Sequence, residues 1–308
     1  MNNTINKIKS IDYLKEVQEI GYTKTDKLAV IEVSGTENFK FLQSQITYDI
    51  NKITSNNWNW AAQTNHQGKT IATFRIYVQK EKIYIITSKE VMQEQIETLE
   101  KYSVFHKVDF KKYTCHIYEV FGDAKNNWME SKELELNNCL VLKDRKLNTI
   151  ISKKSINNIF DKKQEHEGIS SFLHIVSGWP VISNIHIEKH LPQALNMDLI
   201  AGIDYQKGCY IGQENIAKTK YRNINKKNLY IFHSQADSDI KIGNEIKAKI
   251  ENSSKKIGEI VNIFTNDHIS IILGIINTNY ENNKQIFTMA NKKENNIKLE
   301  KIVYKITN

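Results

Sequence analysis

Hydrophobic and polar positions alternate along several stretches of the first hundred residues. Alternation with a period of two, together with many β-branched residues, predicts strands at 27–34, 58–64, 70–80 and 82–87. In 90–102, Val91, Ile96 and Leu99 instead follow helical spacing, which predicts an amphipathic helix. The segment 65–69 contains Gly68, which allows a tight turn between two of these strands. The pattern therefore predicts a unit that mixes helices and strands.

The rest of the chain contains a second mixed block and then a run of short strands. In the second block the pattern predicts strands at 107–120, 138–142 and 148–152, and helices at 155–160 and 169–177. After residue 224, short strands separated by Asn, Ser and Lys clusters predict a small closed β unit. We therefore expect an N-terminal arm at 1–26, two interleaved α/β domains at 27–104 and 105–224, and a C-terminal β-barrel at 225–308.

Length and composition restrict the class of protein. The chain has 308 residues, enough for about two domains. Hydrophobic residues make up 40% and charged residues 25%, which excludes a chain disordered throughout. Three cysteines without a CxxC pair argue against a disulfide framework and a structural zinc site. The N-terminal segment is polar, and apolar runs such as 271–276 are too short to span a membrane. We expect a cytoplasmic protein with no membrane partner.

The net charge of +8 raises the question of an anionic partner. Only three of the 43 basic residues are arginines, at positions 75, 145 and 222. A nucleic-acid interface is better indicated by arginines interleaved with aromatic residues, and the sequence shows no such cluster. A lysine-coated surface is the favoured interpretation, and direct nucleic-acid binding stays open.

The densest chemical signal is the segment KGCYIGQE, residues 207–214. Gly208 and Gly212 allow a sharp turn and a close backbone approach, and a helix is predicted to begin at Gln213. Cys209 then lies just before a helix N-terminus and two residues from Lys207, and both features favour the thiolate form. A reactive cysteine is one interpretation, and a small buried hydrophobic residue is the other.

This segment resembles the signature of the YgfZ family, which is related to the glycine-cleavage T protein, an aminomethyltransferase. The resemblance runs from about residue 27 to 230 and holds almost throughout 192–222. It also includes FLQSQITYDI at 41–50, the hairpin 61–77, KYSVFHKV at 101–108 and GWPVI at 178–182. It implies an α+β, T-protein-like fold of two mixed α/β domains plus a small C-terminal β-barrel.

The resemblance also implies a function and a set of site residues. The implied protein is an accessory factor that binds tetrahydrofolate or polyglutamylated folate and supports assembly or repair of iron–sulfur clusters. Its implied partners are iron–sulfur client enzymes, such as those that methylthiolate tRNA. Cys209 is then the thiolate that touches a transient cluster or a sulfur intermediate, and Lys207 favours ionisation of the Cys209 thiol. No resident metal is expected, and the expected folate-binding residues are Gly208, Tyr210, Gly212, Gln213, Glu214, Phe172 and Arg222.

One departure separates the chain from the aminomethyltransferases. Those enzymes carry an aspartate pair in the strand after the glycine turn, and Ala72 and Thr73 occupy the matching positions here. Neither side chain can act as a carboxylate acid or base. We therefore expect a protein that is not a classical enzyme. Two alternatives stay open, namely a folate-dependent one-carbon transferase and a tRNA-binding module.

Overall fold

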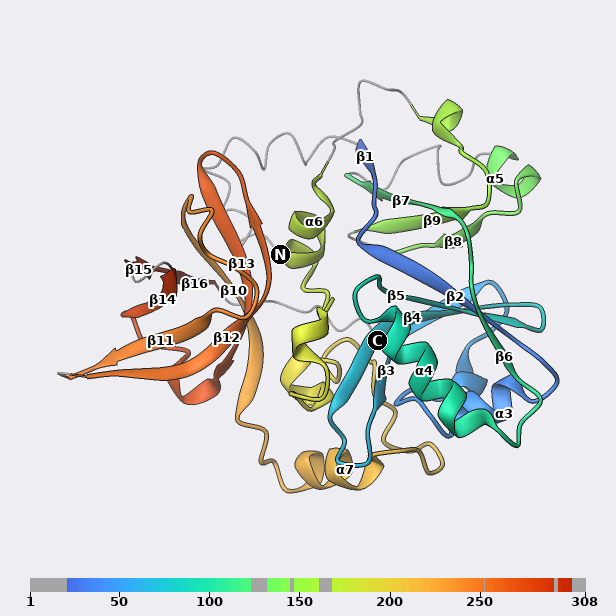
Figure 1. The fold of residues 1–308 in the computed structure, drawn as a ribbon, viewed down its shortest axis with the longest axis horizontal. Coiled ribbons are helices and arrows are strands. Elements are labelled where there is room, and N and C mark those ends of the chain that lie inside the picture. Colours follow the sequence, from blue (N-terminus) through green and yellow to red (C-terminus); the bar gives the residue numbers. More distant parts are fainter. Residues whose placement is uncertain are drawn as a thin grey trace.

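Three β-sheets and a few helices form the part of the chain that this computed structural model describes: residues 21–122, 132–144, 147–160, 168–251, 253–290 and 293–300. A seven-stranded sheet lies on one side of the molecule, and sheets of five and four strands lie on the other (Figure 1). The helix α6 (Ser170–Ser177) lies between the two sides.

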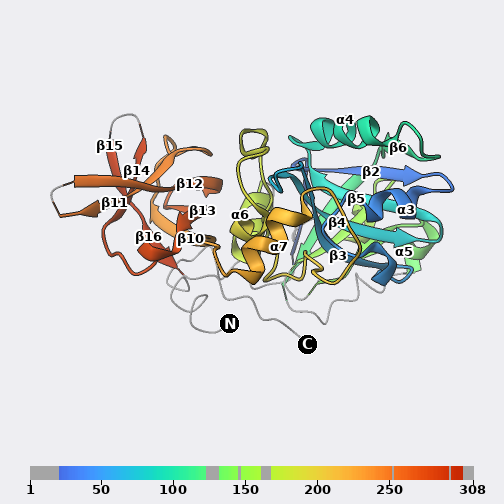
Figure 2. The same cartoon turned by 90° about the horizontal axis from the view of Figure 1, so that it is seen from below.

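The five-stranded sheet is antiparallel and has the order β3-β4-β5-β2-β6. Its strands are β2 (Leu28–Ser34), β3 (Asn57–Thr64), β4 (Thr70–Gln79), β5 (Lys82–Ser88) and β6 (Asp109–Lys112). After β2 the chain forms the short helix α3 (Asn38–Gln43) and the 3₁₀ turn η1 (Ile50–Lys52). The helix α4 (Met92–Ser103) lies along the outer side of this sheet (Figure 2).

The four-stranded sheet has the order β1-β7-β9-β8. Its strands are β1 (Gly21–Lys24), β7 (His116–Phe121), β8 (Leu140–Leu142) and β9 (Asn148–Ser152), and α5 (Lys132–Leu136) precedes β8. Of the expected arm at 1–26, residues 1–20 lie outside the described residues, while 21–24 form β1. The helix expected at 155–160 is only a single 3₁₀ turn, η3 (Asn157–Ile159).

The single strand expected at 107–120 is wrong. The chain forms β6 in one sheet, leaves it, and forms β7 in the other. Tyr113 and Cys115, which lie in the crossing, pack against the hydrophobic cluster that contains Leu28 of β2 and Ile117 of β7. Because the crossing residues are packed as strand residues would be, the hydrophobic pattern continues from β6 into β7. The sequence therefore does not show where one strand ends and the next begins.

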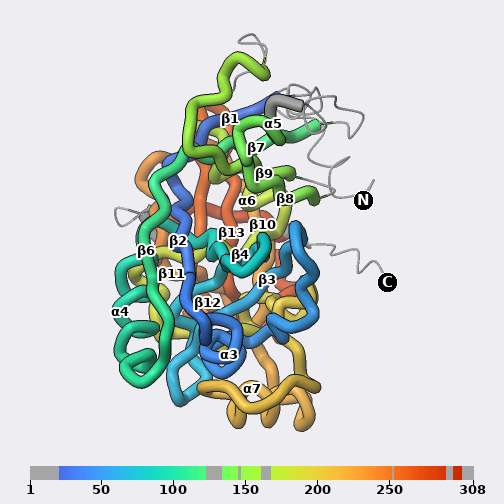
Figure 3. The backbone as a smooth tube through the Cα atoms, turned by 90° about the vertical axis from the view of Figure 1, so that its right-hand side faces the viewer, coloured from blue at the N-terminus to red at the C-terminus, as the bar shows by residue number. Residues whose placement is uncertain are grey.

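The central segment begins with α6, which ends at Gly178 with a φ of 70°. The 3₁₀ turns η5 (Asn184–His186) and η6 (Pro192–Leu195) follow. The helix α7 (Gln213–Tyr221) then leads to the last sheet and lies toward the same end of the molecule as α3 (Figure 3). Trp179 and Leu195 belong to one buried cluster with Phe74 of β4 and Val261 of the last sheet, so this segment joins the two sides.

The seven-stranded sheet is antiparallel and almost closes into a barrel, as expected. Its order is β15-β14-β11-β12-β13-β10-β16. Its elements are β10 (Lys227–Gln235), β11 (Glu245–Ile250), β12 (Ser253–Thr265), β13 (Ile269–Asn277), the turn η7 (Thr278–Tyr280), β14 (Ile286–Ala290), β15 (Lys293–Asn296) and β16 (Lys298–Glu300). Next to β16, the backbone N–H of Ile297 donates to the carbonyl of Ile286, which brings the ends of the sheet together.

A hydrogen bond between His190 of the central segment and Glu259 of β12 predicts an acid-sensitive contact. His190 Nε2 lies 2.7 Å from Glu259 Oε1, and this hydrogen bond lowers the pKa of Glu259 from 4.5 to about 2. The unfolded chain then binds more protons than the folded one as the pH falls below 4.5, so the contact stabilises the fold above that pH. The stability advantage of the wild type over Glu259→Gln is expected to shrink by about 2 kcal/mol between about pH 6 and about pH 3. Urea unfolding of both proteins measures it, and a constant difference would contradict the assignment.

Candidate functional site

The KGCYIGQE segment is fixed at its first residue by a buried ammonium group. Lys207 is 6% exposed, and its Nζ donates to the carbonyl oxygens of Gln43 at 2.6 Å, Ile46 at 2.7 Å and Tyr48 at 3.1 Å. An ammonium has three donors, so all of them are used. Burial lowers the Lys207 pKa to about 8, and the charges of Asp49 and Asp204 oppose this shift. Lys207 therefore anchors the segment to the turn that follows α3.

The other end of the segment is fixed against the turn of the β3–β4 hairpin. Gly212 has a φ of 82°, and a Cβ atom there would lie 2.4 Å from the carbonyl oxygen of Asn65 and 2.7 Å from the Cα of Gly68. Thr64 Oγ1 donates to the carbonyl of Ile211 at 2.6 Å. The two glycine turns are therefore in direct backbone contact, and only glycine fits at position 212.

Between these two anchors the chain is exposed. Gly208 and Cys209 both face solvent, and a Cβ atom at position 208 would have no neighbour within 4 Å. The other cysteines differ: Cys139 is buried and Cys115 is half-buried, and burial raises the pKa of the Cys115 thiol to about 11. Cys209 is therefore the exposed one of the three thiols, held on a short loop whose ends are fixed.

The remaining predicted residues of the segment have different surroundings. The Tyr210 ring is buried, 4.9 Å from Lys207 Nζ, and its backbone N–H donates to Gln213 Oε1 at 3.3 Å. Glu214 lies in the first turn of α7 and is exposed. Arg222 caps the C-terminus of α7 and is also exposed. Tyr210 and Gln213 thus support the loop, while Glu214 and Arg222 lie on the solvent side of α7.

Phe172 lies away from solvent in α6. It is 2% exposed, and its ring packs against Phe264 of β12 at 5.3 Å between centroids. Trp60 and Trp179, which lie in the same core cluster, are 5% and 3% exposed and pack edge to face at 5.6 Å. These rings form part of the core in this conformation.

Sequence reasoning missed a buried cation next to these tryptophans. Arg75 is 1% exposed, and its guanidinium carbon lies 4.3 Å from the Trp179 ring centroid. Nη1 donates to Thr149 Oγ1 at 2.6 Å, whereas Nη2 has no hydrogen-bond partner among the described residues. Burial lowers the Arg75 pKa to about 10, opposed by the charges of Glu119 and Asp144. The available signal was an arginine in the middle of a predicted strand, in a chain with only three arginines.

A series of buried, hydrogen-bonded polar side chains lies next to Trp179. Glu119 is fully buried, and its two carboxylate oxygens contact His174 Nε2 and the Ser170 hydroxyl, which donates at 2.7 Å. Ser170 Oγ also lies 2.7 Å from Thr25 Oγ1. The His174 ring stacks on Trp179 at 5.4 Å. These contacts link α6 to the four-stranded sheet beneath the tryptophans.

No group of three or more His, Cys, Asp or Glu side chains is arranged to hold a metal ion in the described ranges. Nor does any helix among the residues described have the length and apolar character needed to cross a membrane.

Comparisons with known proteins support the predicted relationship. No family model matches the chain. An uncharacterised protein of Haemophilus influenzae is 29% identical over 258 residues, which cover 83% of this chain and 89% of that protein. The tRNA-modifying proteins YgfZ of Buchnera aphidicola and Colwellia psychrerythraea are 27% and 25% identical, covering 77% and 90% of this chain and 81% and 91% of theirs. The chain is a relative of the YgfZ proteins.

A solved structure confirms the fold class predicted with this relationship. The glycine cleavage system aminomethyltransferase T of Bartonella henselae matches with a TM-score of 0.66 at 10% identity, over 94% of this chain and 87% of that one. The α+β, T-protein-like fold is therefore confirmed. At the two positions where those enzymes are expected to carry aspartates, this YgfZ relative has a fully buried Ala72, and Thr73 whose hydroxyl donates to the Pro180 carbonyl.

The contact of Gly212 with the hairpin turn can be tested by substitution, with Gly208 as the control. Gly212→Ala is expected to destabilise the protein by about 3 kcal/mol, because alanine is strained at positive φ and its Cβ meets backbone atoms. Gly208→Ala has open space and a φ outside the left-handed region, so its stability should stay within about 0.5 kcal/mol of the wild type. Thermal and urea unfolding compare the two, and equal losses would show that the hairpin contact does not fix the loop.

Proposed function

We propose that the protein supports tRNA modification as an accessory factor that maintains iron–sulfur clusters in client enzymes and binds tetrahydrofolate. The observation that carries the proposal is Cys209, an exposed thiol on a loop fixed at Lys207 and Gly212, in a chain related to proteins named tRNA-modifying YgfZ. A single thiolate cannot supply the four ligands that a resident cluster ordinarily needs. Its accessible position suits a transient contact with a cluster or a sulfur intermediate held by the client.

The sequence suggests that Lys207 favours the thiolate form of Cys209, but in this proposal Lys207 has a different role. Its ammonium is saturated by three backbone carbonyls, so it has no donor left for the Cys209 thiolate in this conformation. Lys207 is therefore a positioning residue. It holds the first end of the exposed loop while Cys209 meets its partner.

The donor chemistry next to Trp179 fits a folate. A pterin ring is flat and carries a carbonyl oxygen, and Arg75 Nη2 is a buried donor that lacks an acceptor among the described residues. Arg75 and Trp179 would hold the ring, and bound tetrahydrofolate would supply one-carbon or redox chemistry. Because Trp60, Trp179 and Phe172 are at most 5% exposed, this binding requires the aromatic side chains to open.

The role of Cys209 is tested by complementation. In a host deleted for its own YgfZ relative, the wild type should restore tRNA methylthiolation and the activity of an iron–sulfur enzyme, and Cys209→Ala should restore neither. Since Cys209 is exposed, its variant should keep the wild-type melting temperature. Cys115→Ala is the matched control and should rescue fully. Rescue by Cys209→Ala would show that the thiol has no part in the function.

Folate binding is tested separately by calorimetry. Tetrahydrofolate should bind the wild type, and Arg75→Gln should weaken binding at least about 10-fold, because a buried hydrogen bond to a charged donor is lost. Thr149→Val removes the other partner of the guanidinium but keeps its charge, so folate affinity should fall much less. Equal losses in the two variants would indicate general unfolding of this region, and unchanged affinity in Arg75→Gln would exclude Arg75 from the site.

A further inference from the structure

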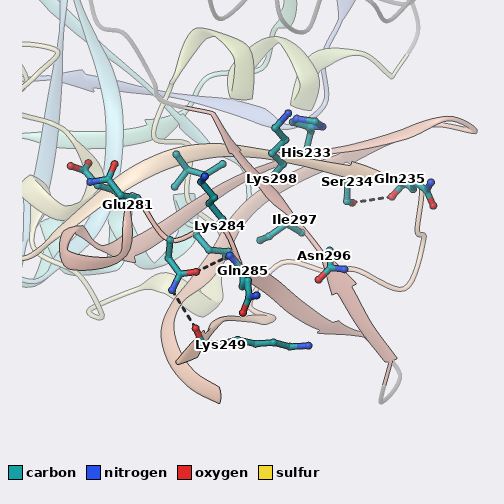
Figure 4. A pocket seen from close by; sticks show the side chains of 14 residues that line it. His233, Ser234, Gln235, Lys249, Glu281, Lys284, Gln285, Asn296, Ile297 and Lys298 are labelled. Carbon is teal, nitrogen blue, oxygen red and sulfur yellow. Dashed lines mark hydrogen bonds between the residues drawn. The ribbon is translucent and has the colours of Figure 1, made fainter. Parts of the chain in front are cut away.

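A large cavity opens along the seven-stranded sheet, away from Cys209 and Arg75. It has a volume of about 950 Å³ and is lined by the end of β10, by residues 281–286 and by the start of β16 (Figure 4). This volume lies at the upper end of the range for small-molecule sites. None of the residues implicated above in cluster or folate chemistry lines it.

The lining of this cavity is cationic and rich in amides. Lys249, Lys284 and Lys298 line it, with Glu281 as the one carboxylate. Glu281 accepts a hydrogen bond from Tyr230 at 2.8 Å, and Lys249 pairs with Glu294 at 2.8 Å. Lys284 and Lys298 have no ion pair within the described part of the chain. Five carboxamide side chains complete the polar lining: Gln235, Asn282, Asn283, Gln285 and Asn296.

A second, smaller cavity is also lined by lysines. Its volume is about 250 Å³, and Lys227, Lys255 and Lys256 line it. Its carboxylate, Glu259, is occupied by His190. Tyr280, at the end of the turn η7, lines this cavity, and the next residue, Glu281, lines the larger one, so η7 connects the linings of the two cavities along the chain.

The turn η7 carries an aromatic ring close to one of these lysines. Tyr280 is partly exposed, and Lys255 Nζ lies 5.9 Å from its ring centroid. Cations interleaved with an aromatic ring suit a polynucleotide, because phosphates pair with the cations and a base can stack on the ring. Carboxamides can pair with base edges that are not already paired.

We propose that these two cavities form a binding site for single-stranded RNA. The phosphates contact the four lysines without an ion pair in the described chain, Lys227, Lys255, Lys284 and Lys298, and one base stacks on Tyr280. The alternative, a uniformly lysine-coated surface, does not explain why the carboxylates lining both cavities are already engaged. The choice of RNA rests on the proposed link to tRNA modification, whereas the cationic site itself rests on the geometry alone.

The experiment measures binding of a fluorescein-labelled single-stranded RNA by anisotropy over a range of salt concentrations. The wild type should show a slope of log K against log salt of about −3, since each of four contacts contributes about −0.7. The double variant Lys284→Gln/Lys298→Gln should bind about 10-fold more weakly, with a slope of about −1.4. The control, Lys111→Gln/Lys112→Gln on the exposed strand β6, should bind as the wild type does.

Three outcomes would overturn the proposal: unchanged affinity of the cavity variant, an equal loss in the β6 control, or equally tight binding of duplex DNA. Cys209→Ala should bind RNA normally, and the cavity variant should keep wild-type thiol labelling at Cys209. Failure of the RNA site therefore leaves the Cys209 function intact, and failure of complementation leaves the RNA site intact.

Discussion

The buried ammonium of Lys207 is the contact on which the candidate site depends. Three carbonyl oxygens, from residues 43, 46 and 48, receive its three donors, although burial lowers its pKa to about 8. The carbonyl of Gln43 belongs to the last turn of α3, where helix geometry leaves backbone acceptors without partners, and the other two belong to the turn that follows. The lysine thus satisfies a local need of the N-terminal unit and, by the same bonds, fixes a loop more than 150 residues later in the chain.

The fixed loop explains how an exposed cysteine can be presented without a pocket around it. Gly208 and Cys209 project between the Lys207 anchor and the Gly212 contact with the hairpin turn. An exposed loop would ordinarily pay a large ordering cost when it meets a partner. Here both ends are already ordered by bonds to the core, so contact between the thiol and any partner costs little further chain entropy.

The sequence predicted the local elements and the segment that carries Cys209, but not the contacts made by its side chains. β2 and the start of α7 lie where the pattern placed them, because each has a clear local signal. The break at 113–115 was missed, since Tyr113 and Cys115 are partly buried against a cluster shared between two sheets. The role of Lys207 was missed because its partners are backbone carbonyls, which carry no residue identity. Arg75 was missed because only the tertiary fold brings Trp179 and Thr149 to it.

The cations of the candidate site and those around the two cavities differ in their exposure to solvent. In the candidate site on the N-terminal side, two cations are buried: the three donors of Lys207 are all used, and Arg75 Nη2 has no acceptor among the described residues. On the C-terminal side the cations are exposed and numerous around two cavities. A buried cation selects a ligand by geometry, because an imperfect partner leaves it unsatisfied, whereas exposed lysines attract any polyanion and depend on salt. The proposed contacts of the Cys209 thiol and of RNA use one kind of site each, and their separation over the two sides lets each act without screening or occupying the other.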